Sequence, residues 1–456
     1  MVRKLFLLLN IVCIFTNVLA SESSIQDKIS QKIQDTDADL NIGIKITNLA
    51  RNEVIFERNA DRYFIPASTL KFITIISLLE HFGKDYKFAS RIYRYNRDYY
   101  IDIHDPDFKP CDLDRLLEDF IKNSGKEITG NLYIIDSKFT VPSLMRGKTH
   151  GDTLYCYGAP VSKVHINKNC STITVAPSSV GQKIKISTSK NFPYIIQNNA
   201  RTIKANNFDR LYTNIKGNKF IIDGTLSIST GKVNAGAVTN EPIVSLKYYL
   251  KQYLAKHNID LRGKILVTDR VPSDKRNLKE ISSISKDMEN ISKIAMKKSD
   301  NFITDYLLAE FATQNNQKEW RFAASSMKDL VKRKFGTDLT RSEIIDGSGI
   351  SRLNLLTVNQ FDSFLNKIAQ KQDFSEIRSL LATPSEDCTL QDRMDSKMLI
   401  YAKTGTLSNV STLVGYFYNK NNELHSFVIM MNNFCGSNIP YRKLEEKILR
   451  LIVGTL

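Results

Sequence analysis

Apolar and polar residues alternate from Asn41 to Leu49, a pattern that predicts a β-strand. The residues at 50–52 are typical of a turn, and Val54–Glu57 predicts the returning strand of a hairpin. A long run, 69–81, then follows Pro66 and is apolar on most sides. Because a helix that is apolar all round must be covered by other elements, we expect this one to be buried.

The pattern changes between residues 89 and 283, where short β-like runs are separated by Gly, Asn, Ser and Pro. These runs lie at 131–135, 171–175 and 183–187. One stretch, 246–257, has helical periodicity. We therefore predict that 89–283 is a large, mostly β insert, itself split near 187–224. This region is called the insert below.

Helical periodicity returns after the insert, and strand patterns close the chain. The predicted elements are helices at 284–297, 302–312 and 441–453, and strands at 398–402, 412–418 and 424–432. Two helix-rich parts, 21–88 and 284–456, together with a terminal antiparallel sheet, predict one α+β domain that the insert interrupts.

The N-terminus has the pattern of a secretory signal. Arg3 and Lys4 precede an apolar run, 5–20, which ends in small residues at Val18 and Ala20. The run is short for a membrane span, although an anchor is the alternative interpretation. We predict a cleaved signal peptide at 1–20 and an exported, periplasmic protein.

Export bears on the five cysteines that follow the signal peptide. Cys156 and Cys170 are near enough in sequence to bridge a hairpin-sized loop in an oxidising compartment. Alternatively, all five are small buried apolar residues. No C-x-x-C pair occurs, which argues against structural zinc.

The formal net charge of the chain is +16. A basic surface suits loose contact with anionic membranes or wall polymers, and it also keeps a protein soluble. Nucleic acid would be an equally suitable partner on charge alone, but export argues against it.

The first candidate for chemistry is Ser68-Thr69-Leu70-Lys71, at the start of the apolar helix. Residues three apart share a helix face, so hydroxyl and amine can meet. A serine becomes nucleophilic beside a base, and lysine serves when its pKa is depressed by burial or by a second cation. The helix N-terminus offers N–H groups to a developing oxyanion. This spacing alone is weak, because it occurs four more times in the chain.

Two further motifs follow in order. Ser299-Asp300-Asn301 is a polar turn between two predicted helices, where an N-cap is the default interpretation. Lys403-Thr404-Gly405 ends a strand-like run, is followed by Thr406, and is the one K-T-G in the chain. A strand glycine lets another backbone come close, as a peptide substrate laid along the edge would require.

Other enzyme classes lack their motifs in this sequence. The six histidines show no H-x-x-x-H or H-E-x-x-H spacing, and neither G-x-S-x-G, a P-loop nor G-x-G-x-x-G occurs. Asp346-Gly347-Ser348-Gly349 is more typical of a tight turn than of a second nucleophile.

The three motifs in this order are those of penicillin-binding proteins and class A β-lactamases. The separation of 231 positions between Ser68 and Ser299 is too long for a plain β-lactamase. The chain resembles the class C low-molecular-mass penicillin-binding proteins, the D-alanyl-D-alanine carboxypeptidase/endopeptidases. The phrases that carry this resemblance are 157–162, 298–301, 346–352 and 402–407. One departure is His104-Asp105-Pro106, where the family usually has Gly-Asp-Pro; it puts the turn in doubt, not the chemistry.

The resemblance implies a transpeptidase-like fold and a metal-free, cofactor-free mechanism. Ser68 would attack the carbonyl of the penultimate D-alanine of a peptidoglycan stem peptide, and β-lactams would acylate the same residue. The resemblance implies that Lys71 accepts the hydroxyl proton, that Ser299 relays a proton to the leaving amine and that Asn301 holds the substrate amide. It also implies that Lys403 and Thr404, with help from Thr406, attract the substrate carboxylate. The N–H groups of Ser68 and Thr406 would stabilise the oxyanion. Gly405 belongs to the same substrate-binding segment.

Two alternatives remain open: a non-catalytic wall-binding scaffold and a β-lactamase-like enzyme on the same fold. Class A β-lactamases activate the deacylating water with a glutamate from an E-x-x-L-N loop. Five glutamates lie between the second and third motifs, and none begins that pattern. We therefore expect slow release of a penicilloyl group.

Overall fold

The computed structural model describes residues 24–189, 192–205, 209–274, 276–386, 388–391 and 393–455. The predicted signal peptide at 1–20 lies outside the described residues. Within the described part of the chain, no helix combines the length and apolar character needed to cross a membrane.

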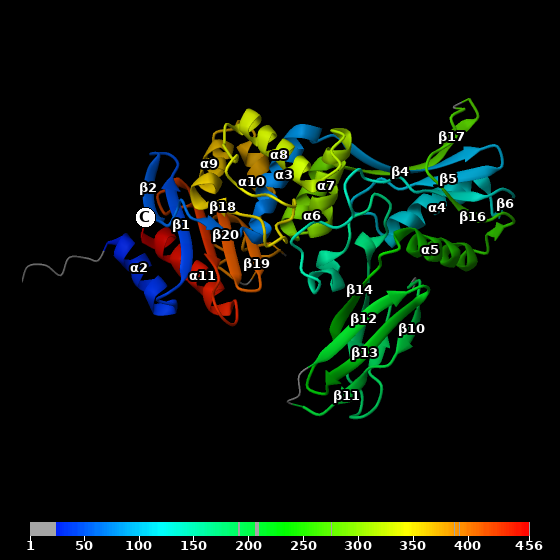
Figure 1. Ribbon diagram of the computed structural model, residues 1–456, viewed down its shortest axis with the longest axis horizontal. Helices are drawn as coiled ribbons and strands as arrows, with labels where there is room; N and C mark the ends of the chain where they lie inside the picture. Colours follow the sequence, from blue (N-terminus) through cyan, green and yellow to red (C-terminus); the bar gives the residue numbers. More distant parts are fainter. Residues whose placement is uncertain are drawn as a thin grey trace, which may run out of the picture.

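The main body is built on a five-stranded antiparallel sheet that joins the two ends of the chain (Figure 1). Its strand order is β19 (Ile400–Leu407), β20 (Val410–Tyr418), β21 (Leu424–Asn432), β1 (Asn41–Asn48) and β2 (Glu53–Arg58). Both predicted hairpins are therefore confirmed, and β1 of one pairs with β21 of the other.

Helices cover both faces of this sheet. Alternate residues of β20 face opposite sides, so Leu413 packs in one hydrophobic cluster and Val414 in the other. One face carries α2 (Ile25–Thr36) and α11 (Ile439–Thr455). The other carries α3 (Leu70–Phe82), α6 (Met288–Lys297), α7 (Asn301–Gln314), α8 (Trp320–Phe335), α9 (Val358–Ala369) and α10 (Phe374–Ser379). The predicted α+β fold and the burial of the long apolar helix are confirmed, because residues 70–78 of α3 are all buried.

The helix predicted from Ile284 begins four residues later, at Met288. Residues 284–287 instead continue β17 (Leu278–Asp287), which pairs with β4 (Lys87–Tyr95). Asp287 then caps the helix, since its side chain accepts from the Asn290 N–H at 2.9 Å. The apolar spacing of this segment fitted a helix, but the strand partner decided its conformation.

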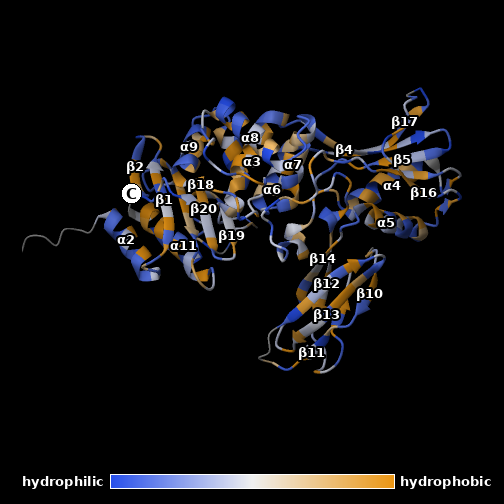
Figure 2. Ribbon diagram, viewed as in Figure 1, coloured by the Kyte–Doolittle hydropathy of each residue, from blue (hydrophilic) through white to orange (hydrophobic). Residues whose placement is uncertain are grey.

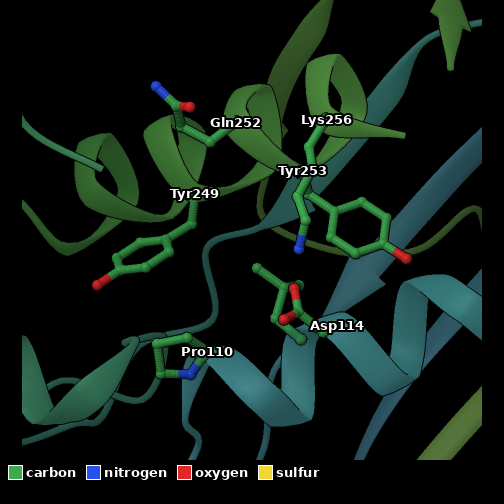
Figure 3. Close-up of a pocket in the computed structure, with 7 residues that line it drawn as sticks. Pro110, Asp114, Tyr249, Gln252, Tyr253 and Lys256 are labelled. Atoms are coloured by element: carbon green, nitrogen blue, oxygen red, sulfur yellow. The ribbon is translucent and has the colours of Figure 1, made fainter. Parts of the chain in front are cut away.

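The insert contains a second five-stranded sheet, of mixed direction. Its order is β16 (Ile265–Thr268), β7 (Leu132–Ile135), β5 (Asp98–Asp102), β4 and β17. The helices α4 (Pro110–Ser124) and α5 (Pro242–Lys256) pack into its hydrophobic cluster. A pocket of about 210 Å³ lies between these helices. In Figure 3, Tyr249 and Tyr253 of α5 lie opposite Pro110 and Asp114 of α4. This pocket contains none of the predicted site residues.

A smaller β module extends from the rest of the insert (Figure 1). One sheet contains β8 (Cys170–Ala176), β9 (Lys185–Ser187) and β14 (Val233–Val238); the other contains β10 (Ile195–Asn198), β11 (Arg201–Ile203), β12 (Arg210–Lys216) and β13 (Lys219–Ser227). Both sheets contribute to one separate hydrophobic cluster. The hydropathy colouring in Figure 2 shows apolar residues along the strands of the module and polar residues on its loops.

Two short pairings complete the strands: β3 (Tyr63–Phe64) with β18 (Leu356–Thr357), and β6 (Glu127–Ile128) with β15 (Asp260–Leu261). Within the first of these pairs, β3 ends four residues before Ser68. It therefore anchors the segment that enters α3.

Candidate active site

Ser68 lies in the 3-10 turn η1 (Ala67–Thr69), at the entry to α3. Lys71 follows one turn later, and its Nζ lies 2.7 Å from Ser68 Oγ. The predicted meeting of the hydroxyl and the amine on one helix face is therefore present. Ser68 is partly exposed, whereas Lys71 is fully buried, so the hydroxyl can be reached while the amine is shielded from water.

Lys71 has three hydrogen-bond partners from three parts of the chain. Besides Ser68 Oγ, its Nζ contacts Asn301 Oδ1 at 2.6 Å and the Ser348 carbonyl oxygen at 2.7 Å. These contacts hold the Nζ atom at a fixed place beside the hydroxyl. An ammonium group with three acceptors uses all three of its protons, so no further partner is needed.

Burial lowers the pKa of Lys71 from 10.5 to about 8. The carboxylates of Asp305, Asp346 and Asp300 act in the opposite direction, while Lys148 lowers the pKa further. With this pKa, Lys71 is neutral in about a tenth of the molecules at pH 7, whereas an exposed lysine is neutral in well under ~0.1% of them. A neutral amine beside Ser68 can accept the proton of the hydroxyl.

The turn at 299–301, called the Ser299 turn below, joins the other two motifs. Ser299 has a positive φ of 55°. Asp300 is the N-cap of α7 and accepts from the Ile303 N–H at 2.9 Å. The N-cap interpretation of this turn is thus correct. Ser299 and Asn301 lie on either side of the cap residue, Ser299 in contact with Lys403 and Asn301 in contact with Lys71.

Lys403 of β19 reaches the Ser299 turn from the sheet. Its Nζ donates to Ser299 Oγ at 2.7 Å and to the Thr404 carbonyl oxygen at 2.8 Å. Burial and the nearby Lys71 hold the pKa of Lys403 well below its usual value. Ser299 is therefore linked to Lys403, and Asn301 to Lys71, so the structure brings all three predicted motifs into one network.

Gly405 allows β19 to pack directly against the Ser68 segment. A Cβ at this position would stand 2.2 Å from Thr412 Oγ1 and 3.0 Å from both the Pro66 carbonyl oxygen and the Ser68 nitrogen. The sequence predicted that this glycine makes room for a substrate backbone. In the structure, the backbone that comes close is that of Pro66 and Ser68.

β19 is an edge strand of the central sheet. Ala402 exchanges two backbone hydrogen bonds with Ala382, at 3.0 and 2.9 Å, on the outer side. Because alternate residues of a strand direct their N–H and C=O groups to the same side, Thr404 and Thr406 present theirs at this outer edge. The arrangement can accept an extended peptide as an added strand.

Unlike the partly exposed Ser68, Ser348 is fully buried. Its Oγ donates to Asp305 Oδ2 at 3.0 Å, and its carbonyl oxygen accepts from Lys71. Gly349, with a φ of 81°, lies so close to Ala67 that a Cβ would meet the Ala67 carbonyl oxygen at 1.8 Å. The 346–349 loop, which the sequence predicted to be a tight turn, therefore packs against the Ser68 segment and Lys71.

The insert supplies two contacts that the sequence did not reveal. Asn301 Nδ2 donates to the Tyr157 carbonyl oxygen at 2.8 Å, and Lys168 Nζ forms an ion pair with Asp300. Cys156 and Cys170 form a disulfide beside these residues, which decides between the two interpretations that the sequence left open. Tyr157 stands in one of the family phrases; Lys168 carries no sequence signal, because its partner is 132 residues away.

A hollow of about 390 Å³ lies beside the Ser299 turn, between it and the disulfide-bridged segments of the insert. Across the part of the chain that the structure describes, no three His, Cys, Asp or Glu side chains gather so as to hold a metal ion. The three motifs bring together hydroxyls, amines and an amide.

Comparison with known proteins finds D-Ala-D-Ala carboxypeptidases along most of the chain. The model of the D-Ala-D-Ala carboxypeptidase 3 (S13) family matches residues 25–450. The D-alanyl-D-alanine carboxypeptidase DacB of Haemophilus influenzae is 24% identical over 420 residues, covering 88% of this chain and 87% of the relative. The D-alanyl-D-alanine carboxypeptidase of an Actinomadura species is 23% identical over 422 residues, covering 86% and 78%.

The fold has a close solved counterpart. The crystal structure of penicillin binding protein 4 (dacB) from Haemophilus influenzae has a TM-score of 0.80 at 22% identity, covering 92% of this chain and 98% of that one. A second structure of that protein contains a β-lactam.

Proposed function

Because this chain belongs to the D-Ala-D-Ala carboxypeptidase 3 (S13) family, we propose that Ser68 is the nucleophile that cleaves D-alanyl peptide bonds of peptidoglycan through an acyl-enzyme. One observation carries the assignment of residues. Lys71 Nζ contacts both Ser68 Oγ and Asn301 Oδ1, while Lys403 contacts Ser299, so the Ser299 turn links the two lysines of motifs that lie far apart in sequence.

Acylation begins when Ser68 Oγ attacks the carbonyl carbon of the penultimate D-alanine. The hydroxyl proton passes to Lys71 Nζ, whose lowered pKa makes it a base near neutral pH. The oxygen of the tetrahedral intermediate lies between the backbone N–H groups of Ser68 and Thr406, which stabilise its negative charge. Ser299 relays a proton to the departing amine, and the C–N bond breaks.

Substrate binding uses the edge of β19. Thr404 and Thr406 hold the substrate along the strand, and Lys403 attracts its carboxylate. Asn301 holds the amide of the acyl part. Carboxypeptidase and endopeptidase cuts share these steps, because both break the bond on the carboxyl side of a D-alanine.

Deacylation distinguishes this site from that of a β-lactamase. Of the five glutamates between the second and third motifs, the buried one is Glu310, and it lies 3.5 Å from both His104 and Lys163. It is therefore paired within the interface to the insert. Without a glutamate to activate water, a bulky penicilloyl group leaves slowly.

The test is incubation with penicillin followed by intact-mass and peptide mass spectrometry. We expect a penicilloyl–Ser68 adduct that lasts for minutes, together with release of D-alanine from peptides that end in D-Ala-D-Ala. Rapid penicillin turnover without an adduct or D-alanine release would indicate a β-lactamase. Binding to wall material without any acylation would indicate a scaffold.

The same proposal includes export to the periplasm and contact with an anionic surface. The β module offers a basic face for this contact. The strand register places Arg201, Arg210, Lys216 and Lys219 on one face of the β10–β13 sheet, with Asp223 as the acid among them. Such a face attracts anionic lipids. Sedimentation with anionic vesicles should fall when Arg210, Lys216 and Lys219 are replaced by Gln; unchanged sedimentation would exclude this face.

A further inference from the structure

Lys168 of the insert lies in an unusual turn. Three successive residues, Asn167, Lys168 and Asn169, have positive φ values of 50°, 57° and 55°. In this left-handed backbone conformation the Cβ atom crowds the neighbouring carbonyl oxygen, so three such residues in a row persist only where surrounding contacts hold them. Strained backbone of this kind clusters at functional sites.

Several contacts enforce this turn. The Lys168 N–H donates to His165 Nδ1 at 3.3 Å, and the buried His165 ring contacts the Asp105 carbonyl oxygen at 2.9 Å. Asn169 Nδ2 donates to the Pro160 carbonyl oxygen at 2.9 Å. The next residue, Cys170, is held by the disulfide. The turn is therefore a fixed platform for the Lys168 side chain.

The platform directs Lys168 to the centre of the Ser299 turn. Its Nζ lies 3.0 Å from Asp107 Oδ1 and forms an ion pair with Asp300, and the side chain is 23% exposed. Burial alone would lower the pKa of Lys168, but the carboxylates of Asp300 and Asp107 outweigh it and raise that pKa. Lys168 therefore stays charged beside Asp300 at neutral pH.

We infer that Lys168 is a positioning residue of the active site, supplied by the insert: its ammonium group fixes Asp300, and through it Ser299 and Asn301, and neutralises a carboxylate that faces Lys71. This inference rests on the proposed function of Ser68 and Lys71. It gives the insert a direct part in setting up acylation.

The electrostatic part of the inference follows from the charges around Lys71. These are Asp300 and Asp305 of α7, Asp346 of the supporting loop, Lys148 of the insert and Lys403 of β19. Asp300 favours the protonated form of Lys71. Without the countercharge of Lys168, this effect grows, and Lys71 should lose its proton only at higher pH.

The test compares Lys168→Met with the wild-type protein by the rate of penicillin acylation between pH 6 and 10. We expect about a tenfold lower rate at pH 7, an alkaline shift of the pH midpoint, and recovery of much of the difference above that midpoint. Lys168→Arg keeps the charge and should keep the wild-type midpoint. The double variant Lys168→Met/Asp300→Asn removes both charges, so its pH midpoint should return towards that of the wild-type protein.

Lys163→Met is the matched control. Lys163 also joins the insert to α7, through Glu310 at 3.5 Å, and its side chain is similarly buried at 19% exposure. It should leave the midpoint unchanged. An equal loss in both Met variants, or a Lys168→Met variant with the wild-type profile, would overturn the inference and leave a docking role only.

Folding and function are separated within the same experiment. If Lys168→Met does not fold, Asp300→Asn tests the charge directly, since asparagine can still cap α7. Loss of the carboxylate should move the midpoint to lower pH, and an unchanged midpoint would refute the electrostatic part. Wild-type protein that is not acylated at Ser68 would instead refute the proposed function itself.

Discussion

Gly405→Ala tests whether the close packing of β19 against Ser68, the proposed nucleophile, sets the reaction geometry. The added Cβ would fall about 1.2 Å short of ordinary contact with Thr412 Oγ1, and about 0.4 Å short with both the Pro66 carbonyl oxygen and the Ser68 nitrogen. Thr412 Oγ1 itself donates to the Pro66 carbonyl oxygen at 2.8 Å, so it cannot move without releasing that segment. β19 and the Ser68 segment must therefore separate.

The expected cost follows from that displacement. Misplacing reacting groups by about 1 Å lowers rates by ~100-fold, which corresponds to about 2.7 kcal/mol of activation free energy. Overpacking lowers the free energy of unfolding by a further ~1–3 kcal/mol, which a domain of this size tolerates. We expect a folded protein whose second-order rate of penicillin acylation at Ser68 falls by about two orders of magnitude.

The assay is stopped-flow or gel-based labelling with a fluorescent penicillin, with melting temperatures measured in parallel. Gly231→Ala is the control, because a Cβ there meets open space. Gly405→Ala/Thr412→Ala removes the shortest contact and should recover part of the rate. Wild-type acylation by folded Gly405→Ala would refute the claim that this contact positions Ser68.

Three further outcomes are expected. The acylation rate should rise about tenfold per pH unit below pH 8 and level off above it, because the neutral fraction of Lys71 rises with pH until its pKa of about 8 is passed; a flat profile from pH 6 to 8 would exclude Lys71 as the base. Ser348→Ala should still be labelled at Ser68 but lose ~1.5–3 kcal/mol of unfolding free energy in chemical denaturation, because a buried hydrogen bond to Asp305 is removed; loss of labelling in folded protein would contradict its structural role. Residues 177–231 can be replaced by an Asn-Gly turn that joins β8 to β14, which are already paired. This variant should keep the wild-type rate of penicillin acylation but change the activity on cross-linked wall material, as measured by product chromatography. Slower acylation would show that the β module also supports the site.

The fold was predictable where one segment contains its own signal. The strands β1, β2, β20 and β21 and the helix α3 were predicted because their apolar periodicity is strong and local. α2 was not predicted, since only Ile29 and Ile33 of its residues are buried, and it depends on α11 for cover. The start of α6 was misplaced because pairing of β17 with β4 overrode the helical pattern of residues 284–287.

For the site, the sequence by itself determined which groups are present and one piece of geometry. The spacing of Ser68 and Lys71 on a single helix turn fixes their contact, because helix geometry is local. The order of the three motifs indicated the family. Sequence alone did not place Lys403 against Ser299, which is 104 residues away, or reveal the role of Gly405.

Tertiary structure decided everything that depends on burial and on partners distant in the chain. The pKa of Lys71 is lowered because the fold removes the amine from water, and burial at one position is a property of all the elements packed around it. The ion pair of Lys168 with Asp300 exists because the insert folds back onto α7. A lysine in a loop gives no local sign of such a contact, since nothing in its own neighbourhood encodes which distant carboxylate it will meet.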